Sequence, residues 1–422
     1  MSIASPLVET PAASASKLLI SLGFVILMTV LPVVAVFARD AIYVLMPVGA
    51  VVALIGAVIG AEGHGPRHLR AALGSKPGLA TLFLAFWAGL SLVWTPFPAD
   101  AAPRFAQIVG TTALVALVAA FLPARMRAFD LYLLPVGVAL GACALLVLTL
   151  RGEAYFADAA GVRDTRFTRA MITQIVLVWP ALGALCLRER WAFAAALALL
   201  AAGVAFAGFA QAALAAMGAA AFVFALAMSN AGGLGAALGL VVAALTLAAP
   251  ALALLLGPLA DAAPRAGAGL QSMAVWRDMI LAEWPRIVTG HGFGAGDRAL
   301  ALGYLPQATP RGLPFVIWHD LGALGALAFA VLAATLFRLA ARAPSEAAPA
   351  LLAGLTAILV LSFLGAASAQ IWWVTLLGCA AIACVALLRG IFRARPAAPG
   401  PDVEEEPGVV AREEAEASAQ SV

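Results

Sequence analysis

Polar residues that could carry out chemistry are concentrated between Trp276 and Leu327, in a chain that is otherwise strongly apolar. The segment reads WRDMILAEWPRIVTGHGFGAGD and, after a short linker, PFVIWHDLGALGAL. Within it, His319 lies between Trp318 and Asp320 at the start of an apolar run. Because an imidazole titrates near neutral pH, His319 can serve as a base or as a hydrogen-bond donor, although a single histidine at a membrane interface is more often inert.

A glycine-rich stretch, GHGFGAGD, precedes this histidine and begins at Gly290. It superficially resembles a nucleotide-binding loop, but it lacks the Lys-Ser/Thr pair of a P-loop and follows no predicted strand. A nucleotide is therefore not expected as a ligand. We expect instead a tight turn in which the backbone N–H groups of Gly290, Gly292 and Gly294 can approach a ligand. His291, inside the turn, is expected to be structural or solvent-facing rather than catalytic.

Arginines form a second cluster, immediately before the apolar run that begins at Met171. Arg163, Arg166 and Arg169 are spaced three apart, so on a helix they would step around about 120° of one surface. Guanidinium groups suit bidentate phosphate binding, and such a row at the headgroup level would fit a lipid-linked pyrophosphate. The alternative is that these side chains only extend toward anionic headgroups.

Composition places these residues in an integral membrane protein. The chain is 64% hydrophobic and 11% charged, with a mean hydropathy of +1.02, whereas soluble proteins carry roughly 25% charged residues. The basic residues are scattered between apolar runs, so the net charge of +3 gives no reason to expect nucleic-acid binding. The four cysteines lie within apolar runs and form no CxxC pair, and no metal site is expected.

The predicted fold is an all-α polytopic bundle. A span needs about 20 apolar residues, and twelve runs fit, with a turn placed at 208–211 to divide one long apolar stretch. Residues 1–390 would form the bundle, and residues 391–422 a disordered, acidic cytoplasmic tail. The predicted spans are 17–37, 41–60, 77–95, 105–122, 130–150, 170–187, 191–208, 211–228, 234–257, 315–338, 349–365 and 368–389.

The distribution of positive charge predicts the orientation. Most basic loop residues fall on one side of this topology, which the positive-inside rule makes cytoplasmic, together with both termini. The outside loops at 151–169 and at 258–314, between the ninth and tenth spans, nevertheless carry several arginines. Either a function there requires cations, or these arginines are ordinary loop charges paired with nearby Asp and Glu.

The pattern resembles the O-antigen ligase / O-antigen polymerase superfamily of bacterial inner-membrane glycan transferases, over nearly the whole chain. Its signature is a Trp, a Pro and a Gly-x-Gly-x-Gly-like turn, followed by a His and a polar residue that open the next span. The RFTRAMITQIVLVWPAL segment, from Arg166 to Leu182, is also similar to the ligases' Arg-led span ending in Trp-Pro. The signature residues are Trp276, Pro285, Gly290, Gly292, Gly294, Gly296, His319, Asp320, Gly322 and Gly325.

The resemblance implies a GT-C-like glycosyltransferase bundle that transfers a glycan from undecaprenyl pyrophosphate to lipid A–core at the periplasmic face. The reaction would invert the anomeric carbon and need no metal or other cofactor. His319 would orient or deprotonate the acceptor hydroxyl, and Arg166 and Arg169 would stabilise the leaving pyrophosphate. The expected partners are the lipid-linked donor, the lipid A–core acceptor and the bilayer. Further substrate contacts are expected from Arg163, Arg265, Arg277, Trp276, Asp320, Gly290, Gly292 and Gly294.

Departures from the family pattern leave alternatives open. Ser272 stands where many members have Arg, Asp320 where many have Asn, and Ala210-Gln211 where a Ser-Arg pair is common. The related activities are those of an O-antigen polymerase and a protein O-oligosaccharyltransferase, and the peptidoglycan polymerases are the nearest enzymes outside the family. A lipid-linked glycan transporter or a scaffold would not be an enzyme. The predicted spans carry few ionisable residues away from their ends, which disfavours a transporter.

Overall fold

The computed structural model describes residues 11–38, 40–60, 65–151, 165–208, 210–262, 267–365 and 371–390. The chain divides into two units, Met1–Gly390 and Ile391–Val422, and the predicted acidic tail lies wholly outside the described residues. Arg163 and Arg265 lie outside them as well. Every regular element in the described part of the chain is a helix.

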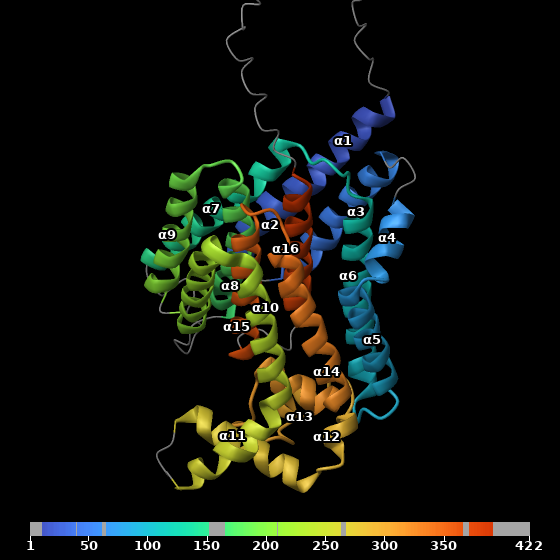
Figure 1. Cartoon of the computed structure of the whole chain (residues 1–422), viewed down its shortest axis with the longest axis vertical. Coiled ribbons are helices and arrows are strands. Elements are labelled where there is room, and N and C mark those ends of the chain that lie inside the picture. The colour runs from blue at the N-terminus through green and yellow to red at the C-terminus, as the bar shows by residue number, and fades with distance from the viewer. Residues whose placement is uncertain are drawn as a thin grey trace, which may run out of the picture. The chain divides into compact units, whose positions relative to one another are not determined.

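The helices are arranged as a bundle with a group of shorter helices at one end (Figure 1). In chain order they are α1 Pro11–Phe24, η1 Val25–Val30, α2 Leu31–Phe37, α3 Ile42–Gly60, α4 Gly65–Leu73, α5 Lys76–Ser91, α6 Pro98–Phe121, α7 Ala128–Leu150, α8 Thr165–Cys186, α9 Trp191–Ala207, α10 Gln211–Ala262, α11 Ala268–Ala282, α12 Arg286–Thr289, α13 Ala295–Ala301, α14 Leu313–Ala341, α15 Ala348–Phe363 and α16 Ile371–Arg389.

Many of these helices are apolar and long enough to cross a bilayer, so the chain is a polytopic helical membrane protein. Within the described residues, eight have the required length and composition, and α9 and α15 are apolar but shorter. The predicted number of twelve spans is not confirmed. The eight are Pro11–Phe37, Ile42–Gly60, Pro98–Phe121, Ala128–Leu150, Phe167–Cys186, Gln211–Ala262, Leu313–Ala341 and Ile371–Arg389.

Helix α10 contains two of the predicted spans. The predicted spans 211–228 and 234–257 both lie within α10, which consists of two helical segments joined at a kink, where Asn230 has non-helical backbone angles (φ −152°, ψ 79°). The side-chain oxygen of Asn230 accepts a hydrogen bond from the N–H of Gly233 at 2.9 Å, as a capping residue does at a helix start. Asn230 therefore marks the start of a second helical segment within α10. The turn predicted at 208–211 does separate α9 from α10.

Contacts between helix ends define two ends of the bundle. At one end, Gly312 before α14 approaches the carbonyl of Phe363, where α15 finishes. Trp372 at the start of α16 lies under the Arg169 guanidinium, 5.5 Å from ring centroid to Cζ, so α8 and α16 begin at this end too. At the opposite end, the N–H of Met126, just before α7, donates to the carbonyl of Arg389 at 3.0 Å. Helix α8 connects the two ends, and 94% of the residues in its apolar stretch are buried.

Candidate active site

The candidate site is built around a break in α14. Gly322 adopts φ 65° and ψ −161° inside this helix, a conformation essentially restricted to glycine. A Cβ at Gly322 would also collide with the carbonyl oxygen of Val288. Glycine is thus required both for the backbone conformation and for the close approach of the 288–290 segment. The first turns of α14, which carry His319, are thereby held against the glycine-rich turn.

The break frees three successive carbonyl groups from the ladder of α14, and groups from other parts of the chain bond to all three. Donors from the glycine-rich turn reach two of the carbonyls, and an indole N–H from α5 reaches the third. The bonds run from the His291 N–H to the His319 oxygen (2.8 Å), from the Gly292 N–H to the Asp320 oxygen (3.0 Å) and from Trp87 Nε1 to the Leu321 oxygen (2.8 Å).

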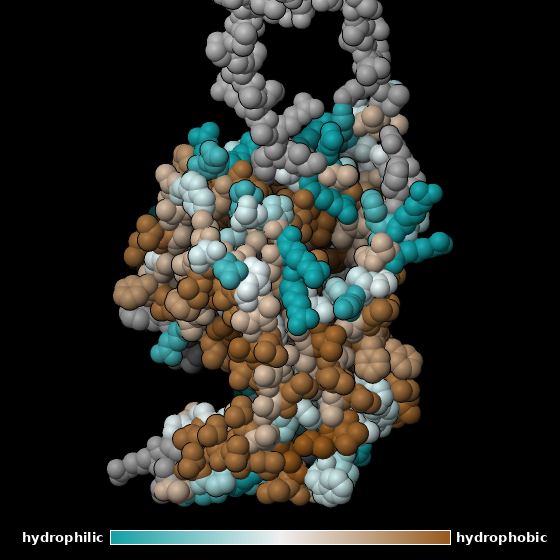
Figure 2. All heavy atoms as spheres, viewed as in Figure 1, coloured by the Kyte–Doolittle hydropathy of each residue, from teal (hydrophilic) through white to brown (hydrophobic). Residues whose placement is uncertain are grey.

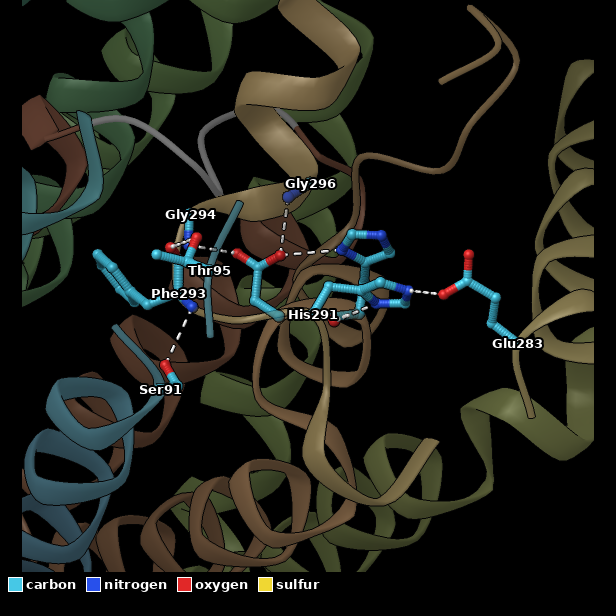
Figure 3. A network of polar contacts seen from close by, with 9 residues as sticks. Ser91, Thr95, Glu283, His291, Phe293, Gly294 and Gly296 are labelled. Carbon is cyan, nitrogen blue, oxygen red and sulfur yellow. Dashed lines mark hydrogen bonds and ion pairs between the residues drawn. The ribbon is translucent and has the colours of Figure 1, made fainter. Parts of the chain in front are cut away.

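The Asp320 carboxylate is the centre of the site and is 5% exposed. Its Oδ2 accepts from the Gly294 N–H at 3.0 Å, and its Oδ1 accepts from the Gly296 N–H at 2.9 Å (Figure 3). Oδ1 also lies 3.0 Å from Nδ1 of His319. A carboxylate at this position favours the tautomer with the proton on Nδ1, which leaves a lone pair on Nε2 for a substrate proton. The pair has the geometry of an oriented general base.

The glycines of the turn thus have a defined structural role. The N–H groups of Gly290, Gly292 and Gly294 donate to the Arg286 carbonyl, to the Asp320 carbonyl and to the Asp320 carboxylate, respectively. They were predicted to approach a ligand, but in this structure their bonds are made within the chain. We therefore assign them to positioning the His319–Asp320 pair.

His291 was expected to be structural or solvent-facing, and it contacts the candidate base directly. The two imidazole rings stack with centroids 4.3 Å apart and planes 10° apart. Nδ1 of His291 lies 3.0 Å from the His319 carbonyl, and Nε2 lies 3.1 Å from Oε2 of Glu283 (Figure 3). Both partners are acceptors, and either ring nitrogen can donate to the one it faces. His291 and Glu283 therefore hold the face of His319 in place.

Two further aromatic rings lie beside His319. Phe315 stacks on its ring at 5.2 Å, and Trp276 meets Phe315 edge-on at 5.4 Å. Trp276 is 5% exposed, so the structure places this predicted substrate contact one ring away from His319. Nε1 of Trp318 donates to the Thr246 carbonyl at 2.7 Å, which ties the same turn of α14 to α10.

The chain matches no protein-family model, no curated protein and no solved structure. The site must therefore be interpreted from its own geometry.

The cavity beside His319 is small, with a volume of about 30 Å³. That is enough for one water molecule and too little for a sugar. Figure 2 shows a larger indentation between the segment carrying α11–α13 and the helices above it. Residues lining the small cavity include Glu283, Arg286, His291, Trp318 and His319.

The predicted arginines do not all gather at this cavity. Arg277 is paired with Asp261 at 2.6 Å and with Asp278 at 2.7 Å, and these hydrogen bonds raise the pKa of Arg277. Pairing with local carboxylates was the alternative interpretation of the loop arginines, and Arg277 follows it. Arg166 lies in α8, but its side chain is not among the described ones. Arg169 pairs with Asp40 at 3.2 Å beside Trp372.

Arg286 is a cation that sequence reasoning did not single out. It lines the His319 cavity and is exposed, and in the described part of the chain it makes no ion pair. The sequence feature that could have identified Arg286 is its position between Pro285 and the glycine-rich turn. Its guanidinium lines the same cavity as the candidate base, where it could meet an anionic substrate.

Helices α5 and α6 support the turn from behind, through contacts that no local pattern could reveal. Ser91 Oγ accepts from the Phe293 N–H at 3.0 Å, and Thr95 Oγ1 donates to the Phe293 carbonyl at 3.2 Å. Arg104 pairs with Asp297 at 2.8 Å. Burial raises the pKa of Asp297, and the charge of Arg104 acts in the opposite direction.

Proposed function

We propose that this protein is a glycosyltransferase of the O-antigen ligase type. It transfers a glycan from undecaprenyl pyrophosphate to lipid A–core at the periplasmic face of a bacterial inner membrane. The proposed transmembrane bundle has about twelve spans. The observation that carries the proposal is His319, whose Nδ1 lies 3.0 Å from a buried carboxylate, at the end of the bundle where Arg169 and Arg286 also lie.

The proposed reaction is a single displacement. A hydroxyl of the acceptor sugar gives its proton to Nε2 of His319 as its oxygen attacks the anomeric carbon of the donor. The bond between that carbon and the pyrophosphate oxygen breaks, and the electron pair leaves with the pyrophosphate. Attack from the face opposite the leaving group inverts the anomeric carbon. Asp320 keeps the proton on Nδ1 and stabilises the imidazolium that forms.

The arginines provide the charge that the leaving group requires. A pyrophosphate gains negative charge as the bond breaks, and fixed guanidinium groups stabilise that charge in a partly desolvated site. Arg286 lines the same cavity as His319 and would contact the reacting end of the donor. Arg169 lies at the same end of the bundle and would contact the lipid-linked pyrophosphate, together with the predicted Arg166.

The decisive experiment is the lipopolysaccharide banding pattern of a deletion strain complemented with wild type, His319→Ala or the control His68→Ala, a histidine of α4. A ligase requires that the deletion leave only lipid A–core while long glycan accumulates on undecaprenyl pyrophosphate. It also requires that only His319→Ala fail to restore the ladder. Core bearing a single repeat would identify a polymerase, and loss of glycoprotein staining a protein glycosyltransferase. A normal pattern in the deletion strain would refute all three.

Replacing Arg169 with alanine is expected to lower the transfer rate about a hundredfold, because one charge-stabilising group is lost at the pyrophosphate. Rates are measured with purified protein and a lipid-pyrophosphate-linked donor. Arg277→Ala is the matched control, because two carboxylates already neutralise that guanidinium. Equal losses in the two variants would show that Arg169 acts only through the fold.

A further inference from the structure

A large cavity lies at the end of the bundle opposite to His319. It is formed between α7, α8 and α9 and has a volume of about 550 Å³, within the range of small-molecule sites. Most of its lining is aliphatic or aromatic, and the only charged lining residue is Arg190. The lining residues are Tyr132, Pro135, Val136, Ala139, Leu185, Arg190, Phe193, Ala196, Leu197 and Leu200.

The cavity opens on the outer surface of the bundle. Two of its lining residues are exposed apolar side chains, Val136 at 49% and Phe193 at 63%. They belong to α7, which has the length and composition of a membrane span, and to the apolar helix α9. An opening between two such helices faces hydrocarbon, so the occupant that can enter sideways is a hydrocarbon chain.

Two guanidinium groups lie at the end of the cavity where α8 gives way to α9. Arg190 lines the cavity itself. The Arg188 guanidinium lies 4.6 Å from the centroid of Tyr132, another lining residue, and NH1 is 3.4 Å from the Tyr132 hydroxyl. The turn between them is tight, because Glu189 has φ 57° and the Arg190 N–H donates back to the Leu185 carbonyl at 3.0 Å. The chain reversal therefore fixes both arginines next to an apolar cavity.

We propose that this cavity binds one acyl chain of an anionic glycerophospholipid, with the lipid phosphate against Arg188 and Arg190. The apolar lining of the cavity suits the acyl chain of such a lipid, and the two arginines at one end of the cavity suit its anionic headgroup. Basic pockets between membrane helices bind anionic headgroups in this way, and the guanidinium forks suit phosphate oxygens. This site is separate from the His319 site and does not depend on the transferase proposal.

Native mass spectrometry of the purified full-length protein tests the site, with phosphatidylglycerol and phosphatidylcholine of identical acyl chains added in turn. Phosphatidylglycerol is expected to bind more tightly. Arg188→Gln and Arg190→Gln are each expected to weaken its binding about fivefold, while leaving phosphatidylcholine nearly unchanged. Arg338→Gln and Arg342→Gln are the controls, because these arginines lie at the C-terminal end of α14, outside the cavity. Neither control should change the preference.

A second variant tests the apolar part of the cavity and leaves both arginines unchanged. Ala139→Phe places a ring in the cavity and is expected to reduce the binding of both lipids, with an unchanged thermal unfolding temperature. Equal affinity for the two lipids would overturn the proposal. It would also be overturned if the control arginines had effects as large as those of Arg188 and Arg190, or if Ala139→Phe bound lipid as the wild type does.

Discussion

Replacing His319 with glutamine is expected to lower the rate of glycan transfer by about 10²–10⁴-fold, the contribution of a positioned general base. Glutamine fills much of the same space and can still donate a hydrogen bond to Asp320, but it cannot accept the proton of the acceptor hydroxyl. The protein should therefore remain folded while the chemical step fails. The rate is measured with purified protein, a lipid-linked donor and a lipid A–core acceptor.

The matched control is His291→Gln. That side chain stacks on His319 and bonds to Glu283, so its loss should loosen the base without removing it. We expect a smaller fall in rate than for His319→Gln. If His319→Gln retained a rate within tenfold of wild type, His319 would not be the base, and the transfer would need another acceptor for the proton.

Replacing Asp320 with alanine is expected to have the largest effect on stability, with the free energy of unfolding falling by about 3 kcal/mol. The change removes the acceptor of two glycine N–H groups and of His319 Nδ1. The N–H of Gly296 is left without its partner in a buried position, which is costly. Thermal unfolding in detergent, followed by intrinsic fluorescence, measures the loss.

Asp320 has two roles, accepting hydrogen bonds from the glycine-rich turn and orienting His319, and the Asp320→Asn variant distinguishes them. An amide retains one oxygen for a glycine N–H, so stability should fall less than in Asp320→Ala, and many members of the resembled family have Asn after the His. Asp278→Ala is the control for loss of an exposed carboxylate, with an expected cost of about 1 kcal/mol or less. An Asp320→Ala protein as stable as this control would contradict the anchoring role.

Much of the bundle could be predicted from the sequence, because burial in lipid requires long apolar helices and the composition shows them directly. A helix lies in each of the twelve predicted places, although α10 covers two of them. Their number as spans could not be predicted in the same way. An apolar run indicates that a segment is kept away from water. It does not indicate how deeply the segment lies in the bilayer, or whether a kink such as that at Asn230 interrupts the helix.

The candidate site was only partly predictable, for a different physical reason. His319 and Asp320 are adjacent in the chain, so their pairing could be anticipated, and the Arg277–Asp278 pair is local in the same way. The contacts of Trp87 and Ser91 join α5 to residues more than 200 positions later. No spacing rule within one helix or turn contains that information, because it depends on how the helices meet.

The contact between Trp87 and Leu321 also has a consequence for biosynthesis. These residues are 234 positions apart, which at ordinary elongation rates separates their synthesis by roughly 10–50 s. During that interval α5 is already made, but the carbonyl that receives its indole N–H does not yet exist. The contact forms only where α14 is broken at Gly322, because an unbroken helix would keep the Leu321 carbonyl for its own hydrogen bond. The candidate site is thus among the last parts of the protein to assemble, and a chain truncated before α14 would lack it entirely.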